Sequence, residues 1–398
     1  MRLYAFEGIH YTPQAGDAGE LAAPPYDQVN DALRDRFHAR SPHQFVHLSK
    51  PVAPEGGDPY RFAAALHHRW LHEGIIARDP RPAIYPYVIE LAGGGERLGV
   101  LGLVRYEDPA VIRPHEATLD KPLADRAALL EAMRVDLEPV LLLAADRGRL
   151  DALLREDLAG LRPLVRHRDA DGHAHVLYRI DDPARIARYR EALDVPAAIA
   201  DGHHRYKVGQ RFAQEHRAAP GTAAAAKLAV VTSLDSPALT IDPIHRAFKE
   251  PIDLSRLAGL AATAQPFHGQ SGHDFAAAVA AAPQPALGVW VLGREPEVWH
   301  FAQPGLAVEV FQDAILPALG LPAEAATDGT VVYRSHAGEL WSQVAAGDLG
   351  TGIWLPPMQP AAFAAAIAGG KMLPAKSTRF LPKVMSGLVW ADHESKLL

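Results

Sequence analysis

Apolar and polar positions alternate in short blocks along this chain of 398 residues. Apolar runs at 83–91 and 97–106 predict strands, and because a Gly-rich turn separates them they indicate a β-hairpin. A third run at 139–145 predicts a short buried strand. Apolar residues at helical spacing over 58–73 predict an amphipathic helix. Residues 196–200 form one more apolar run, and it ends directly before a cluster of titratable side chains.

The same patterns place the remaining elements and the fold class. Strands and helices follow one another without strict alternation, so we predict an α+β (mixed α/β) fold with a mixed sheet flanked by helices. The length allows two or three domains, and we predict an N-terminal lobe over 1–220 and a C-terminal α/β lobe over 221–398. The Ala/Pro-rich stretch 261–286 indicates a peripheral lobe or a boundary. Further strands are predicted at 2–7, 173–180, 228–234, 287–293, 297–302, 330–334 and 351–356, and helices at 123–134, 181–193, 205–218, 254–264, 273–282, 307–319 and 358–368.

Composition narrows the classes of function. The chain has 40 Lys and Arg residues against 47 Asp and Glu, and its net charge of −7 argues against a general nucleic-acid binder. It has no cysteine, so disulfides, thiolate catalysis and cysteine-based zinc sites are excluded. The N-terminus lacks the apolar core of a signal peptide, and no apolar run approaches the roughly 20 residues of a membrane span. We therefore expect a cytoplasmic protein with no membrane partner.

The densest cluster of candidate chemistry lies in the segment AIADGHHRYKVG. Asp201 can serve as a base, a metal ligand or an orienting group. His203 and His204 are candidate acid/base groups or ligands, and Arg205 can clamp an anion. Gly202 allows a backbone to approach a ligand closely, and the first N–H groups of the following helix point at whatever lies above them. The alternative is a solvated turn with a helix-capping aspartate.

A second cluster is the segment RPHEAT, which we expect to be a polar loop. Glu116 follows His115 directly after a proline, and a carboxylate beside an imidazole in a fixed loop suits a general base. An exposed polar loop in front of a capped helix is the alternative.

The third cluster is the basic segment KMLPAKSTRFLPK, residues 371–383. Lys376, Ser377 and Thr378 lie between two prolines, and a lysine with hydroxyl groups suits phosphate oxygens. A local basic patch stands out in a chain of net negative charge, although a solvated basic loop is the alternative.

Two weaker segments are candidates for substrate binding. Tyr26 and Asp27 end an extended Pro-Pro loop that enters a helix, and His245 with Arg246 ends an apolar segment. The second pair can line a cleft or cap a strand.

The remaining histidines are interpreted as structural. His67 and His68 are expected on a helix surface. His173 and His175 have a spacing that would suit a metal, but we interpret them as exposed on a polar strand face. The chain has no Walker loop and no HExxH motif.

Five segments occur in order along the chain: APPYD, PHEAT, IADGHHRY, IHR and KSTRFLPKVMSGLV. Together they closely resemble the family catalogued as domain of unknown function 1015, over nearly the whole chain. The sequence departs from that family at Lys207, Val208 and Gly209, where Glu-Thr-Ala is common, and at Arg379, where an aromatic residue is usual. These departures leave the DGHHR segment intact.

That family is distantly similar to the ParB/sulfiredoxin superfamily, so the resemblance implies a ParB/sulfiredoxin-like nucleotide-binding core. Nucleotide-binding members carry a Gly-x-x-Arg segment at a helix start that contacts phosphates, and Gly202 and Arg205 match its spacing. Free-serine kinases of the superfamily pair a similar DGHHR segment with a catalytic glutamate, to which Glu116 is matched. The resemblance also implies that the loop around Lys376 returns to the DGHHR site, and it suggests a link to serine metabolism.

The leading hypothesis is a nucleotide-dependent phosphotransferase that acts on a small hydroxy metabolite such as free serine, with Mg²⁺ accompanying the nucleotide. Glu116 would accept the proton of the acceptor hydroxyl, while the DGHHR segment would bind phosphate. The residues assigned are Glu116, His115, Asp201 and His203 for catalysis; Gly202, His204, Arg205, Lys376, Ser377 and Thr378 for phosphate or nucleotide; Tyr26, Asp27, His245 and Arg246 for substrate; and Asp201 for a metal ion.

Two other hypotheses stay open. A metal-dependent phosphatase or other hydrolase would use His115, Glu116, Asp201, His203 and His204 as an oxygen and nitrogen site. A non-enzymatic regulator would bind nucleotide without any turnover. The expected partners are a nucleotide and a small-molecule substrate.

Overall fold

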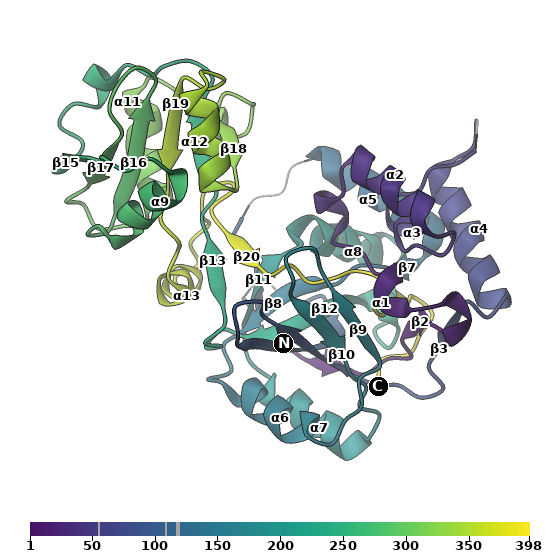
Figure 1. Cartoon of the computed structure of the whole chain (residues 1–398). Helices are drawn as coiled ribbons and strands as arrows, with labels where there is room; N and C mark the ends of the chain where they lie inside the picture. Colours follow the sequence, from purple (N-terminus) through teal and green to yellow (C-terminus); the bar gives the residue numbers. More distant parts are fainter. Residues whose placement is uncertain (55, 108–109, 117–119) are drawn as a thin grey trace. The chain divides into compact units, whose positions relative to one another are not determined.

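The computed structural model describes residues 1–54, 56–107, 110–116 and 120–398 and divides into two compact units (Figure 1). Unit 1 consists of Met1–Pro114, Thr118–Leu239 and Pro382–Leu398, and unit 2 of His115–Ala117 and Thr240–Leu381. The predicted lobe boundary at residue 220 therefore differs from the division after Leu239. The physical reason is that residues 226–233 form a central strand of the unit 1 sheet.

Unit 1 is built on a mixed sheet with nine strands in the described part of the chain. Their order is β6-β11-β8-β12-β5-β4-β10-β9, with β1 paired to β5. The pairs β6–β11 and β8–β12 are parallel and the others are antiparallel. The strands are β1 (Leu3–Tyr4), β4 (Tyr85–Glu90), β5 (Glu96–Arg105), β6 (Ile112–Arg113), β8 (Val140–Ala144), β9 (Val165–Arg168), β10 (Ala174–Leu177), β11 (Ala197–Asp201) and β12 (Ala226–Ser233).

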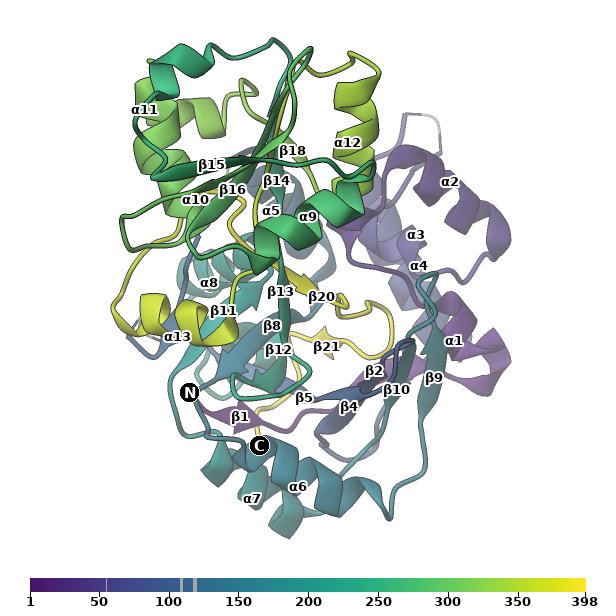
Figure 2. The same ribbon diagram turned by 60° about the vertical axis from the view of Figure 1, so that its left-hand side comes forward.

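Helices cover both faces of this sheet (Figures 1 and 2). On one face α6 (Arg149–Leu158) and α7 (Pro183–Ala192) pack together and bury Leu150, Leu154 and Tyr189 in the core. The other face carries α8 (His203–Glu215), which packs against α5 (Asp120–Met133). The remaining elements of unit 1 are α1 (Ala18–Leu21), α2 (Asp31–Arg40), α3 (Val46–Ser49), α4 (Pro59–His72) and the short strand pairs β2 (Ile9–Tyr11) with β3 (Ile76–Arg78) and β7 (Val135–Asp136) with β21 (Ala391–Asp392).

Unit 2 holds an antiparallel sheet of six strands among its described residues, in the order β15-β17-β16-β19-β14-β18. Two separate apolar clusters form around the sheet, one with α9 and α12 and the other with α10 and α11. The strands are β15 (Thr263–Pro266), β16 (Ala286–Val291), β17 (Glu297–His300), β19 (Thr351–Trp354), β14 (His245–Phe248) and β18 (Val332–Arg334), with the pair β13 (Thr240–Asp242) and β20 (Arg379–Leu381) apart from them. The helices are α9 (Gly272–Ala281), α10 (Ala307–Val310), α11 (Leu316–Ala318), α12 (Ala337–Ala345) and α13 (Pro360–Ala368).

The predicted fold class, a mixed sheet flanked by helices, is confirmed. The helix expected at 254–264 is wrong, because only a short 3₁₀ turn at Leu254–Leu257 forms before strand β15. The stretch 261–286 is not a boundary either, since it supplies β15 and α9 to unit 2. In the described part of the chain, no helix is long and apolar enough to cross a membrane.

Candidate functional site

The DGHHR segment forms the junction between strand β11 and helix α8. Asp201 ends the strand and Gly202 caps the helix with φ at 91°, in the left-handed region. A Cβ atom at Gly202 would lie 2.8 Å from Cγ1 of Val140, so glycine is required there by both backbone conformation and space. Helix α8 begins at His203, two residues before the predicted start. Its first N–H groups and the positive end of its dipole are placed directly after the strand.

The carboxylate of Asp201 is held between two cations. Oδ2 accepts a hydrogen bond from Nη2 of Arg205 at 2.7 Å, and Oδ1 accepts from Nζ of Lys383. Burial raises the pKa of Asp201, but Lys383 and Arg205 outweigh this effect, so that the pKa lies below its usual value. Asp201 is therefore an ionised anchor for two positive charges.

Arg205 is 7% exposed and joins three segments of unit 1. Its Nη1 donates to the carbonyl oxygen of Pro139, one residue after the buried Glu138. Burial lowers the pKa of Arg205, but the carboxylates of Asp201, Glu138 and Asp27 more than offset this and raise it. The guanidinium is a fixed cation, and its pairing with carboxylates leaves it charged.

The APPYD segment of unit 1 lies close to Glu138 and Arg205. The backbone N–H of Tyr26 donates to Oε1 of Glu138 at 3.0 Å, and the guanidinium of Arg126 lies 4.2 Å from the centre of the Tyr26 ring. Asp27 is exposed and contributes to the field at Arg205. Tyr26 and Asp27, predicted as substrate-binding residues, therefore interact electrostatically with Arg205 of the DGHHR segment.

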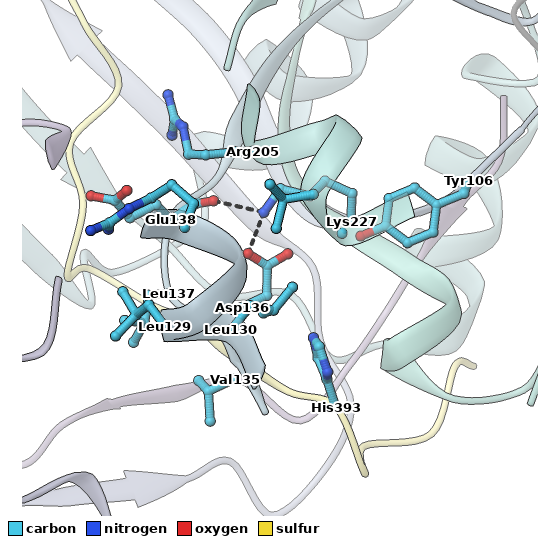
Figure 3. A pocket seen from close by; sticks show the side chains of 13 residues that line it. Tyr106, Leu129, Leu130, Val135, Asp136, Leu137, Glu138, Arg205, Lys227 and His393 are labelled. Carbon is cyan, nitrogen blue, oxygen red and sulfur yellow. Dashed lines mark hydrogen bonds and ion pairs between the residues drawn. The ribbon is translucent and has the colours of Figure 1, made fainter. Parts of the chain in front are cut away.

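Arg205 lines a small cavity of about 50 Å³ in unit 1 (Figure 3). Nζ of Lys227 donates to Asp136 and, at 3.0 Å, to the carbonyl oxygen of Glu138. His393 is also buried, its Nδ1 has no hydrogen-bond partner among the described residues, and burial lowers its pKa to about 4. A cavity of this size, with charged groups in a partly apolar lining, has room for a few water molecules. The lining residues are Tyr106, Arg126, Leu129, Leu130, Val135, Asp136, Leu137, Glu138, Arg205, Val208, Gly209, Lys227 and His393.

Asp201 does not fit the predicted role of a metal ligand. Each of its oxygens already accepts from a cation, whereas Mg²⁺ needs carboxylate oxygens that point at the ion. Within the described residues, the one group of three close potential metal ligands is Asp169, Asp171 and His173, in the turn between β9 and β10. Asp169 there accepts bonds from the N–H groups of the turn, so this group is explained by the turn itself.

In unit 2, His115 and Glu116 are bound to the loop that contains Lys376, Ser377 and Thr378. Nε2 of His115 lies 2.9 Å from Oγ1 of Thr378, and the carbonyl oxygen of His115 accepts from the N–H of Leu373 at 2.8 Å. Oε1 of Glu116 accepts from the backbone N–H of Lys376 at 2.8 Å. His115 is fully buried, so the alternative of an exposed polar loop is wrong at this residue. Ala117 and Thr118 of the same motif lie outside the described residues.

Arg246 supports the same loop from strand β14. Its guanidinium is buried and donates to the carbonyl oxygen of Lys376 at 3.1 Å. Burial lowers its pKa to about 10, and Glu116 acts in the opposite direction. His245 is also buried, and its Nδ1 accepts from the N–H of Leu355 at 3.1 Å. Burial lowers the pKa of His245 to about 3, so the ring is neutral. Both residues are buried, and their hydrogen bonds support neighbouring segments of unit 2.

The structure thus sorts the predicted site residues into two groups. Unit 1 contains Tyr26, Asp27, Asp201, Gly202, His203, His204 and Arg205, and unit 2 contains His115, Glu116, His245, Arg246, Lys376, Ser377 and Thr378. The hydroxyl of Ser377 donates to the carbonyl oxygen of Pro374 at 2.5 Å, which closes the loop on itself.

Sequence patterns missed several charged residues of the unit 1 group. Glu138 and Lys227 directly precede the predicted strands 139–145 and 228–234, and they were overlooked because these strands were interpreted only as apolar runs. Asp136 lies in the short strand β7, which the pattern did not predict. Two histidine interpretations are also wrong. His67 and His175 are both buried, and each has a hydrogen-bond partner in the interior. His67 accepts from the indole N–H of Trp390, and His175 is hydrogen-bonded to the hydroxyl of Tyr87.

Fold and site together define a mixed α/β protein with a cation-rich strand-to-helix junction. The chain belongs to the family described as "Protein of unknown function (DUF1015)", whose model matches residues 3–302. That range contains four of the five motif segments and ends before KSTRFLPKVMSGLV. A search of curated proteins found no match.

The solved structures that are similar to this chain include the following three. A conserved hypothetical protein from Pyrococcus furiosus is 12% identical, with a TM-score of 0.37, over 74% of this chain and 94% of that one. A free serine kinase in complex with AMP is 15% identical, with a TM-score of 0.37, over 70% of this chain and 87% of that one. SbnI from Staphylococcus aureus, with a C-terminal truncation, is 13% identical, with a TM-score of 0.36, over 71% of this chain and 84% of that one.

Proposed function

We propose that this protein is a nucleotide-dependent phosphotransferase that acts on a small hydroxy metabolite, with free serine as the first acceptor to test. The observation that carries the proposal is the junction at Gly202. A glycine in the left-handed conformation opens a helix of 13 residues, and a buried arginine lies in the first turn of that helix. Backbone N–H groups, the helix dipole and a fixed guanidinium are the groups that bind phosphate oxygens.

Phosphoryl transfer depends mainly on positioning and on neutralising the charge of the phosphates. In this proposal Gly202, His204 and Arg205 bind the nucleotide phosphates, and His203 orients the substrate. In unit 2, the residues that we assign to phosphate are Lys376, Ser377 and Thr378. The general base is Glu116, whose orientation is fixed by the N–H of Lys376. His115 positions Glu116 and the loop through its contacts with Thr378 and Leu373.

Mg²⁺ enters the proposal as the companion of the nucleotide phosphates. Because both oxygens of Asp201 are occupied by cations, we assign Asp201 to hold Arg205 rather than a metal ion. Mg²⁺ keeps several waters and is often held through substrate phosphates with few protein ligands, so a dedicated protein site is not required.

The experiment is a nucleotide panel with Mg²⁺, read by thermal shift, on the wild type and on Arg205→Lys. A ligand at a hundredfold excess over its Kd stabilises the folded state by about 2.7 kcal/mol. We expect a shift with one or more nucleotides, and a smaller shift in the variant because lysine cannot reproduce the two-sided contact of the guanidinium with Asp201 and Pro139. Transfer of the terminal phosphate to serine and other hydroxy acids is then assayed.

The same assay separates the proposal from the alternatives. Binding without transfer to any acceptor would favour the regulator. A shift with transition metals but with no nucleotide would favour the hydrolase. Among the described residues Asp201, His203 and His204 do not form a group of metal ligands, so the hydrolase has less support.

A further inference from the structure

Lys383 lies outside the roles proposed above, and its surroundings in unit 1 are unusual for a lysine. Its side chain is only 17% exposed, and its ammonium group is directed to the carboxylate of Asp201 instead of to solvent. Placing a lysine this way costs desolvation and side-chain entropy. A chain segment that needed only to be anchored would not require a cation at that position.

The backbone on both sides of Lys383 is held by buried side chains. Nη2 of Arg97, which is 2% exposed, donates to the carbonyl oxygen of Pro382 at 2.6 Å. The N–H of Met385 donates to the hydroxyl oxygen of Tyr87 at 3.1 Å. Lys383 therefore projects from a segment that is fixed one residue before it and two residues after it.

The hydroxyl of Tyr87 is itself fixed. It lies 2.6 Å from Nδ1 of the fully buried His175, and Nε2 of His175 lies 2.9 Å from Oδ2 of Asp169. This chain of hydrogen bonds runs from the turn after β9 to the Lys383 segment. A fully satisfied buried network of this kind makes the geometry of the groups that it holds rigid.

Several charged side chains of unit 1 interact with the carboxylate of Asp201. Lys383 and Arg205 are ion-paired with it, and His203 and Arg97 also interact with it electrostatically. The other carboxylates in reach, Glu138 and Asp27, face Arg205. The carboxylate of Asp201 thus interacts with two ion-paired cations, Lys383 and Arg205, and with the buried guanidinium of Arg97.

We propose that Lys383 is a phosphate-binding residue that acts together with Arg205, and that Tyr87 and Arg97 are its positioning residues. Because Lys383 and Arg205 contact the two oxygens of one carboxylate, their donor groups are close enough to bind one phosphate group placed next to Asp201. The ligand class is the di- or triphosphate of a nucleotide, or inorganic pyrophosphate. This inference rests on the proposed function, since it assigns a further residue to the same anion site.

The test measures Kd for MgATP, MgADP and pyrophosphate by calorimetry. Lys383→Met keeps the length of the side chain and removes the charge, and we expect its Kd to rise by about 10- to 100-fold, the range of a lost charge-assisted hydrogen bond. Lys383→Arg should restore part of the affinity. Lys396→Ala is the matched control, because Lys396 is an exposed lysine of the same C-terminal segment, and its Kd should not change.

Tyr87→Phe tests the positioning role. It retains the ring and removes the acceptor for the N–H of Met385, so we expect a several-fold rise in Kd when Lys383 is present and no further rise in the Lys383→Met background. An equal effect in both backgrounds would show that Tyr87 has only a structural role.

The outcomes separate the two proposals. If the wild type binds none of the three probes, the proposed function fails and the assignment of Lys383 fails with it. If the wild type binds and Lys383→Met binds equally well, the assignment of Lys383 fails while the proposed function stands.

Discussion

Lys383 and Asp201 are 182 positions apart in the sequence and form an ion pair inside unit 1. The pair joins the DGHHR segment to the last residue of the basic segment KSTRFLPK. That basic segment is divided between the units, since Lys376 and Thr378 contact Glu116 and His115 in unit 2. Lys376 and Lys383 of this segment therefore lie in different units, and their roles can be tested separately.

Gly202→Ala should destabilise unit 1 more than the matched variant Gly148→Ala. Both glycines cap a helix in the left-handed conformation, with φ at 91° and 74°. An alanine in that conformation costs about 1–2 kcal/mol. A Cβ at Gly148 would meet no atom within 4 Å, whereas one at Gly202 would lie 2.8 Å from Val140 and 3.2 Å from the guanidinium of Arg205.

We therefore expect a loss of about 2–4 kcal/mol for Gly202→Ala in denaturant unfolding, and weaker nucleotide binding because Arg205 is displaced. Equal losses of stability in the two variants, with equal binding, would contradict a close approach at Gly202.

Glu116→Gln should abolish turnover and retain nucleotide binding. Glutamine keeps the oxygen that accepts the N–H of Lys376, so the loop remains in place, but it cannot accept a proton from an acceptor hydroxyl. We expect kcat to fall by about 10²- to 10⁴-fold, the contribution of a general base. Transfer rates and Kd for the nucleotide are measured on the same preparation, and full activity in this variant would eliminate Glu116 as the base.

Most elements of the fold could be predicted from the sequence, because the strands of unit 1 are continuous apolar runs and the helices carry clear caps. The hairpin of β4 and β5 and the junction of β11 and α8 fall within a few residues of their predicted bounds. The short strand β14 was missed because its His245 and Arg246 are polar residues that the fold buries.

The candidate site was less predictable, because its ion pairs join residues far apart in the chain. Asp201 is identifiable from its neighbours, whereas its pairing with Lys383 depends on the path of the 142 residues from Thr240 to Leu381, after which the chain returns to unit 1. Glu138 and Lys227 are single charges in apolar surroundings, and no local pattern distinguishes such a charge from one at a strand end.

The stability of unit 1 should fall between pH 7 and pH 5 through His67. This side chain is 2% exposed, burial lowers its pKa to about 4, and its Nε2 accepts from the indole N–H of Trp390 at 3.1 Å. The unfolded chain takes up a proton near pH 6.5, and the folded chain resists protonation until about pH 4. The stabilisation is therefore complete above pH 6.5 and is lost as the pH falls toward 4, by about 2 kcal/mol between pH 7 and pH 5.

Denaturant unfolding at the two pH values measures this effect. His67→Gln retains an acceptor for Trp390 without titrating, and its stability should depend less on pH than that of the wild type. The exposed neighbour His68, changed to Gln, is the control and should leave the pH dependence as it is. A variant His67→Gln with the full wild-type pH dependence would show that other groups cause it.

Lys376→Gly should separate the backbone role of this residue from its role in binding phosphate. Lys376 has φ at 58°, which favours glycine, and its backbone is held by Glu116 on one side and Arg246 on the other. Its side chain is exposed, so the fold does not require a lysine. We expect Lys376→Gly to unfold at an equal or higher denaturant concentration, with a gain of up to about 1 kcal/mol.

If Lys376 binds phosphate as proposed, the same variant transfers phosphate more slowly or with a higher KM. Arg217→Gly is the control, because Arg217 is also exposed and has φ at 48°, just after the end of α8. It should gain similar stability and keep full activity. Full activity in both variants would leave Lys376 with a backbone role alone and would remove it from the phosphate-binding residues.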